Sequence, residues 1–265
     1  MSVYLNRSIS NSTVAAFVLF LTLPSLGLTK DLSALVDKRL SHDGKTLDLS
    51  GMNIGSKGAK KLASMESLAD VTTLFLQGNN IRAKGMRALA KSPHIAKLKH
   101  LDLWGNLLGD LGLKAISESP YLTHLESLKI WKNEVGDDGI ETMINSSNFT
   151  NLKTLMLNDN LITPDGAKIL SMATGLGQLV TLNLFRNDIG DKGALAFAGS
   201  ENFPNVQLLY LGQNNISDQG AIALIQSKNY PELKVLDMAM NPLSERTAME
   251  VFKVNRIGKV QIIYR

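Results

Sequence analysis

The sequence predicts an α/β solenoid in which a short strand and a helix alternate eight times. Three observations lead to this prediction. A Leu-x-Leu pattern returns every 27 residues, an asparagine follows it at a fixed distance, and a helical pattern begins beyond each asparagine. A fixed period in this range is typical of repeat proteins, because one unit cannot bury its apolar faces alone and stacked units share a continuous core.

The Leu-x-Leu pattern predicts one strand in each repeat. Side chains two positions apart point to the same face of a strand, so each pair of leucines indicates one buried strand face. One further step of the period after the eighth pair reaches Ile263, where a last strand is expected. The pairs are LDL (47–49), LFL (74–76), LDL (101–103), LKI (128–130), LML (155–157), LNL (182–184), LYL (209–211) and LDM (236–238).

An asparagine follows the second leucine by three residues in every repeat except the first, which has Met52 there. A chain that turns sharply after its strand leaves backbone polar groups inside the protein, and an inward amide side chain can pair them from coil to coil. We therefore predict that these asparagines form a structural ladder rather than a binding site. They are Asn79, Asn106, Asn133, Asn160, Asn187, Asn214 and Asn241.

Beyond each asparagine the apolar spacing changes to that of a helix, as with Leu113 and Ile116 at i and i+3. A glycine recurs at the start of the first seven of these segments, where we expect it to serve helix entry or close packing. Aspartates precede four of the segments, at positions where a carboxylate can cap a helix. These aspartates are Asp110, Asp137, Asp191 and Asp218.

The segment LVTLNLFRNDIGDKGALAFA (179–198) resembles the leucine-rich repeat, and in particular the ribonuclease-inhibitor-like subclass with a helix in each repeat. The resemblance covers about residues 46–265. It implies a right-handed leucine-rich-repeat solenoid, a horseshoe with parallel strands on the concave face and helices on the convex face. Mammalian ribonuclease inhibitors are rich in cysteine, whereas this chain has none. Their particular target is therefore not transferred to this protein.

The N-terminal residues differ from the repeats. Residues 14–23, VAAFVLFLTL, form an apolar run that follows a single cation, Arg7, and precedes small residues. This order is that of a secretory signal peptide, so we expect residues 1–27 to be one. The protein is then secreted, periplasmic or on the cell surface. The alternative is an uncleaved N-terminal anchor formed by residues 14–23.

A solenoid also needs ends that close its core. Within residues 28–45, the segment DLSALVDKRL (31–40) places its apolar side chains on one helical face, so we expect an N-terminal capping helix there. The repeat domain is expected to span residues 46–265, with the degenerate eighth repeat and a final strand at the other end. The apolar side chains of the expected cap are Leu32, Leu35, Val36 and Leu40.

The exposed face of the predicted sheet carries aromatic and charged side chains. Neighbouring strands lie about 4.8 Å apart, so Trp104 and Trp131, which hold the same position in consecutive repeats, are expected to be adjacent. Exposed aromatic side chains beside cations are typical of binding hot spots. The alternative is that they only stabilise the sheet by cross-strand packing. The predicted partner-binding strip on the concave face comprises Phe75, Trp104, Trp131, Phe185, Tyr210, Lys129, Lys132 and Arg186.

The composition favours a non-enzymatic module that binds another protein. The net charge is +4 with no run of like charge, which argues against nucleic acid as the main partner. The absence of cysteine excludes thiolate metal sites, and no other residues have the spacing of metal ligands or of a phosphate-binding loop. The constant period leaves no long loop for an active site. We therefore expect a monomer with no cofactor and no metal.

Three alternatives to protein binding remain open. A carbohydrate or small ligand could stack on the adjacent tryptophans. A hydrolase could use His100, with Asp102 two residues later to orient its imidazole, although no nucleophile joins them in the sequence. A structural surface protein would tolerate substitution throughout the strip. Contact with a membrane is expected only through an uncleaved N-terminal segment.

Overall fold

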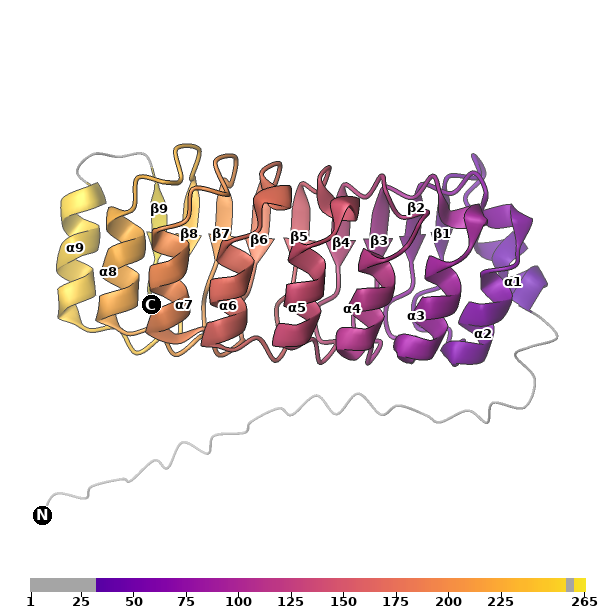
Figure 1. Cartoon of the computed structure of the whole chain (residues 1–265), viewed down its shortest axis with the longest axis horizontal. Helices are drawn as coiled ribbons and strands as arrows, with labels where there is room; N and C mark the ends of the chain where they lie inside the picture. The colour runs from indigo at the N-terminus through magenta and orange to yellow at the C-terminus, as the bar shows by residue number, and fades with distance from the viewer. Residues whose placement is uncertain (1–31, 256–259) are drawn as a thin grey trace, which may run out of the picture.

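The computed structural model describes residues 32–255 and 260–265 (Figure 1). The predicted signal peptide, residues 1–27, and the alternative anchor, residues 14–23, lie outside the described residues. Within the described ranges, none of the helices combines the length and the apolar character needed to cross a bilayer.

The described strands are parallel and form one open sheet in chain order (Figure 1). Each of the first eight strands ends at the residue between the two apolar residues of its Leu-x-Leu pattern. The register joins residues 27 positions apart, as in the pairing of Leu101 with Leu128. The last pairing is shorter by one residue, because Leu236 lies opposite Ile262 instead of the predicted Ile263. The strands are β1 (Thr46–Asp48), β2 (Thr73–Phe75), β3 (His100–Asp102), β4 (Ser127–Lys129), β5 (Thr154–Met156), β6 (Thr181–Asn183), β7 (Leu208–Tyr210), β8 (Val235–Asp237) and β9 (Gln261–Ile263).

A helix follows each of the first eight strands, and these helices stand side by side over one face of the sheet (Figure 1). We call that side of the molecule the helix face and the opposite side the strand face. The predicted solenoid, with parallel strands on one face and helices on the other, is thereby confirmed. The helices are α1 (Leu32–Arg39), α2 (Gly55–Leu62), α3 (Arg82–Ala90), α4 (Gly109–Ser117), α5 (Asp137–Ile144), α6 (Pro164–Ser171), α7 (Gly190–Ala198), α8 (Asp218–Gln226) and α9 (Glu245–Asn255).

The core lies between the sheet and the helices and runs the length of the solenoid. Both apolar residues of every Leu-x-Leu pattern, from Leu47 to Met238, are at most 3% exposed. At the N-terminal end, α1 lies against α2 and β1. It buries Leu32 and Val36, and Leu40 pairs with Leu47 across an antiparallel bridge.

The asparagines that follow the strands hydrogen-bond from one coil to the next. Nδ2 of Asn106 donates to the carbonyl oxygens of Leu76 in the preceding coil and Leu103 in its own coil, at 2.8 and 2.9 Å. Its Oδ1 accepts from the backbone N–H groups of Asn79 and Ile81 at 3.1 Å. Each such side chain satisfies backbone groups that the sharp turn leaves inside the protein.

The prediction that the aspartates at the helix N-termini cap their own helices is wrong. We expected each to cap its own helix, but Asp137 is the first residue of α5 and its carboxylate accepts from the next coil. Oδ1 of Asp137 accepts from the Thr163 backbone N–H at 3.0 Å, and Oδ2 accepts from the Thr163 hydroxyl at 2.5 Å. Asp191 binds Ser217 in the same way. The reason is that stacking places the N-termini of neighbouring helices side by side.

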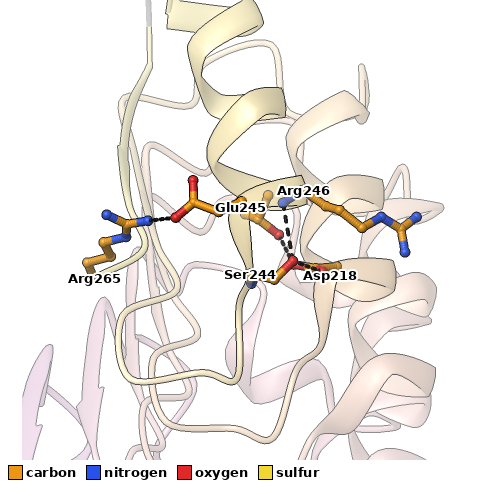
Figure 2. Close-up of polar contacts among 6 residues, drawn as sticks. Asp218, Ser244, Glu245, Arg246 and Arg265 are labelled. Carbon is orange, nitrogen blue, oxygen red and sulfur yellow. Dashed lines mark hydrogen bonds and ion pairs between the residues drawn. The ribbon is translucent and has the colours of Figure 1, made fainter.

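Figure 2 shows this contact at the last described helix, α9. The carboxylate of Asp218 accepts from the Ser244 backbone N–H at 2.9 Å, from the Ser244 hydroxyl at 2.5 Å and from the Thr247 hydroxyl at 2.6 Å. These hydrogen bonds lower the pKa of Asp218 to about 2, with that from the Ser244 hydroxyl contributing most. Arg265 joins the end of the chain to α9 through an ion pair with Glu245 at 2.7 Å.

The low pKa of Asp218 predicts a pH-dependent contribution to stability. Its value of about 2 in the folded protein lies below the ordinary 3.8, so the stabilisation is present above about pH 4 and is lost as the pH falls through 2. We expect Asp218→Asn to lower the melting temperature at pH 7 and the difference from wild type to vanish near pH 2. Melting curves by circular dichroism between pH 7 and pH 2 test this. Ser244→Ala, which keeps the carboxylate, should show a smaller difference, and a difference independent of pH would contradict the assignment.

Candidate functional site on the strand face

Two tryptophans stack at the middle of the strand face. Trp104 and Trp131 directly follow the second leucine positions of their repeats, and the register brings them side by side. Their ring centroids lie 4.4 Å apart at an interplanar angle of 13°. Both side chains are half-buried, so the stack keeps part of its surface open to solvent.

Phe185 holds the same position two repeats further along, and a glycine makes room for it. The equivalent residue of the next repeat is Gly212, and a Cβ atom there would lie 2.8 Å from Cδ2 of the Phe185 ring. The ring therefore rests on the Gly212 backbone. Phe185, like the tryptophans, is half-buried.

Phe75 and Tyr210 lie in a separate row, on the strands themselves. Phe75, with His100, Asp102 and Lys129, lines a hollow of about 230 Å³. A larger, open hollow of about 630 Å³ extends from Lys129 to Tyr210, and Met156 and Asn183 also line it. We call these two hollows together the strand groove. Lys129 lines both hollows. It therefore lies between Phe75 and Tyr210, the two aromatic side chains that are farthest apart in the predicted strip.

A third row lies just beyond the tryptophans, where the backbone is left-handed in every repeat. The first three repeats place glycine there: Gly51, Gly78 and Gly105, with φ between 65° and 68°. The next three place Lys132, Asp159 and Arg186, with φ of 54°, 54° and 60°. A left-handed conformation costs a residue with a side chain about 1 kcal/mol relative to glycine. Gln213 and Met240 occupy the last two positions.

The charges of the strand face are partly paired. Arg186 lies 3.1 Å from Asp159, and Lys129 lies 3.8 Å from Asp102. Burial raises the pKa of Asp102, although a hydrogen bond from the Trp104 backbone N–H and the charge of Lys129 oppose the rise. No ion pair within the described residues involves Lys132, whose side chain is exposed.

Sequence reasoning did not predict a group of ion pairs, which we call the clamp, that lies just before the neighbouring strands β3, β4 and β5. Oε1 of Glu126 lies 3.0 Å from Lys99 and Oε2 lies 2.8 Å from Lys153. Hydrogen bonds from these two lysines lower the pKa of Glu126 to about 2. The three residues hold equivalent positions in consecutive repeats, so the 27-residue spacing is the signal that could have revealed the clamp. It fixes one edge of the strand groove, which Glu126 and Lys153 line.

His100 and Asp102, the residues of the hydrolase alternative, lie on the same strand, β3. Oδ1 of Asp102 accepts from the Trp104 backbone N–H at 3.2 Å, and among the described residues no hydrogen bond joins the carboxylate to His100. The His100 side chain is exposed. Within residues 32–255 and 260–265, no group of three His, Cys, Asp or Glu side chains is placed to hold a metal ion.

Comparison with known proteins agrees with the repeat pattern. The family model described as "Leucine Rich repeat" matches residues 45–63, 68–90, 94–117, 121–143, 179–198 and 204–224. No curated protein matches the chain.

Among solved structures, similar chains include the crystal structure of the LRR ectodomain of the plant membrane receptor kinase GASSHO1/SCHENGEN3 from Arabidopsis thaliana in complex with CASPARIAN STRIP INTEGRITY FACTOR 2. The sequence identity is 17% and the TM-score 0.43, over 76% of this chain and 22% of that one. The present chain thus spans less than a quarter of that structure. The period, the parallel sheet and the matched family model together identify this chain as a leucine-rich-repeat protein.

Proposed function

We propose that this protein is a non-enzymatic module that binds a protein partner on its strand face. The binding strip is the one predicted from the sequence, with Trp104, Trp131, Phe185 and Tyr210 as anchors. Lys129, Lys132 and Arg186 supply charge, and Phe75 lies at the N-terminal end. Stacked repeats generally offer such extended surfaces to partners.

The observation that carries the proposal is the row of left-handed residues. The first three repeats fill this position with glycine, which fits the backbone without strain. The fourth to sixth repeats, in the middle of the predicted strip, instead carry Lys132, Asp159 and Arg186, and Lys132 and Arg186 directly follow Trp131 and Phe185. Strained side chains of this kind cluster at functional sites, and surface ion pairs such as Arg186 with Asp159 contribute little to stability. Recognition of a partner gives a reason for placing charge there.

The tryptophan stack supports a protein partner over a carbohydrate. A sugar ring packs on the free face of an indole, whereas in this stack each indole covers one face of the other. In addition, Nε1 of Trp104 is buried without a hydrogen-bond partner among the described residues, which costs stability. If this side chain only stabilised the scaffold, phenylalanine could fill the position without burying an unpaired N–H group.

The remaining parts of the proposal rest on the sequence pattern. The helix in every repeat supports the ribonuclease-inhibitor-like subclass. The pattern of residues 1–27 supports export, so we propose that the protein acts outside the cytoplasm or on the cell surface, as a monomer.

The test is an affinity capture that separates function from stability. Lys132→Gly with Arg186→Gly removes two charges and two strained residues, so we expect the free energy of unfolding to stay within about 1 kcal/mol of wild type. The immobilised full-length wild type and variant are exposed to an extract of the native environment, and mass spectrometry compares the retained proteins. We expect the variant to lose the specific partner, with affinity reduced at least about tenfold.

Gln213→Gly with Met240→Gly is the matched control, because it relieves the same strain at the same position of the two following repeats. This control should retain the partner. If the charge-removing variant retains it equally well, the strand-face proposal is wrong. A marked loss of stability in that variant would instead assign these side chains to the scaffold.

A further inference from the structure

The helix face gathers unpaired cations at its N-terminal end. Lys57 and Lys60 project from α2, Lys84 and Arg87 project from α3, and Lys91 directly follows α3. All five side chains are exposed. We call these five residues the basic face. Helices α2 and α3 are neighbours near the N-terminal end of the solenoid (Figure 1).

Within the described residues, no carboxylate lies within ion-pair distance of the basic face. Some cations on other surfaces are paired, since Lys97 lies 2.7 Å from Asp70 and Lys153 lies 2.8 Å from Glu126. Lys57 and Lys84 hold equivalent positions in consecutive repeats, as do Lys60 and Arg87, so like charges stand beside one another on packed helices. This arrangement opposes folding through repulsion, which favours a role outside the fold.

The charge of the helix face then reverses. Helix α5 carries Asp137, Asp138 and Glu141 and no cation. The net charge of the whole chain is only +4, so composition hides this separation of charge. Because acidic residues Glu66 and Asp70 lie between α2 and α3 in the sequence, the basic face also escapes a search for runs of like charge.

Space and an apolar side chain adjoin the cations. A hollow of about 530 Å³ lies between α3 and α4, and Arg87, Lys91 and Leu111 are among the residues that line it. Lys114 and Glu118 also line it and form an ion pair at 3.6 Å, so Arg87 and Lys91 supply its unpaired positive charge among the described residues. Leu111 is 58% exposed although it belongs to a helix of the repeat domain. Cations around an open hollow, with a leucine projecting beside them, match the boundary between phosphate headgroups and acyl chains.

We propose that the basic face docks on an anionic phospholipid surface, with phosphate headgroups at Arg87 and Lys91 and Leu111 directed toward the acyl chains. The cations form two rows across two helices, and such an area fits a surface better than the single row that tracks a linear polyanion. The strand face lies on the opposite side of the protein. Docking in this way leaves the proposed partner-binding strip open, so this inference goes beyond the proposed function.

Vesicle sedimentation of the full-length chain tests the proposal. The probes are vesicles of phosphatidylcholine alone and of equal parts phosphatidylcholine and phosphatidylserine, so that any binding through residues 14–23 is measured on the neutral vesicles and subtracted. We expect binding that depends on phosphatidylserine and weakens with salt. Lys84→Gln with Arg87→Gln and Lys91→Gln should lower the partition coefficient by about a hundredfold.

Lys168→Gln with Lys228→Gln and Lys234→Gln removes the same charge from exposed positions elsewhere and should bind like wild type. Equal binding by the two triple variants would overturn the proposal. A competition with duplex DNA gives a second outcome that would overturn the proposal. If DNA releases the protein from the vesicles at a phosphate concentration below that of the lipid phosphate, the basic face fits nucleic acid better than a lipid surface. Circular dichroism melting checks that both variants fold, which we expect because all six substituted side chains are exposed.

Discussion

Replacing Asn133 with leucine is expected to lower the free energy of unfolding by about 5 kcal/mol, because buried backbone groups lose their partners. Asn133 is fully buried. Its Nδ2 donates to the carbonyl oxygens of Leu103 and Trp131 at 2.9 and 3.1 Å. Its Oδ1 accepts from the backbone N–H groups of Asn106 and Leu108 at 3.0 and 3.2 Å. Leucine has a similar volume but can replace none of these hydrogen bonds.

Urea unfolding followed by circular dichroism measures the loss, with Asn241→Leu as the matched control. Asn241 makes the same four kinds of hydrogen bond, to Leu211, Met238, Asn214 and Ile216. Its side chain is only half-buried, so water can satisfy part of what the substitution removes. We expect a loss of about half that of Asn133→Leu. Losses below about 1 kcal/mol in both variants would show that the ladder is dispensable.

The second large effect reverses the usual rule for glycine in a helix. Replacing glycine by alanine within a helix normally stabilises it by up to about 1 kcal/mol. Gly193 lies inside α7, where a Cβ atom would lie 2.6 Å from Cβ of Ala167 on α6 and would also collide with Ile189. We therefore expect Gly193→Ala to destabilise the protein by about 3 kcal/mol, since neither neighbour can turn away.

Gly199→Ala provides the control for this prediction. Gly199 ends the same helix at φ of −87°, and the nearest atom to its added Cβ would be the Leu195 carbonyl oxygen at 3.6 Å. We expect a change within about 0.5 kcal/mol. Thermal melting of both variants is sufficient, and similar melting temperatures would mean that the helices are not packed as closely as described.

The period of the sequence was sufficient to predict the fold. It places every Leu-x-Leu pattern on a buried strand face, from Leu47 to Met238. It failed at the last step, where the pairing of Leu236 with Ile262 is one residue shorter than the period. It also failed for the aspartates, because a cap is predicted within one segment, whereas Asp137 binds Thr163 in the next coil. Interactions between coils depend on how the helices are stacked.

For the candidate site, the sequence could predict only which residues share a row. Equal spacing places Trp104 beside Trp131. The structure adds that the rings are stacked and that Nε1 of Trp104 has no hydrogen-bond partner in the part of the chain that is described. The seat of Phe185 on Gly212 depends on a contact between neighbouring coils. The proposed partner-binding role of these residues stays a prediction for the capture experiment.

By itself, the sequence determined the solenoid, its buried face and the rows of its exposed face, because a strict period repeats the same local conformation. Only the tertiary structure decided which rows carry strain or unpaired charge. The left-handed backbone at Lys132 and Arg186 follows from turns that the stacked coils impose. The basic face arises because packing brings α2 and α3 together across an intervening loop with acidic residues. Strain and electrostatic potential depend on distances between coils, and the order of residues along one coil does not contain those distances.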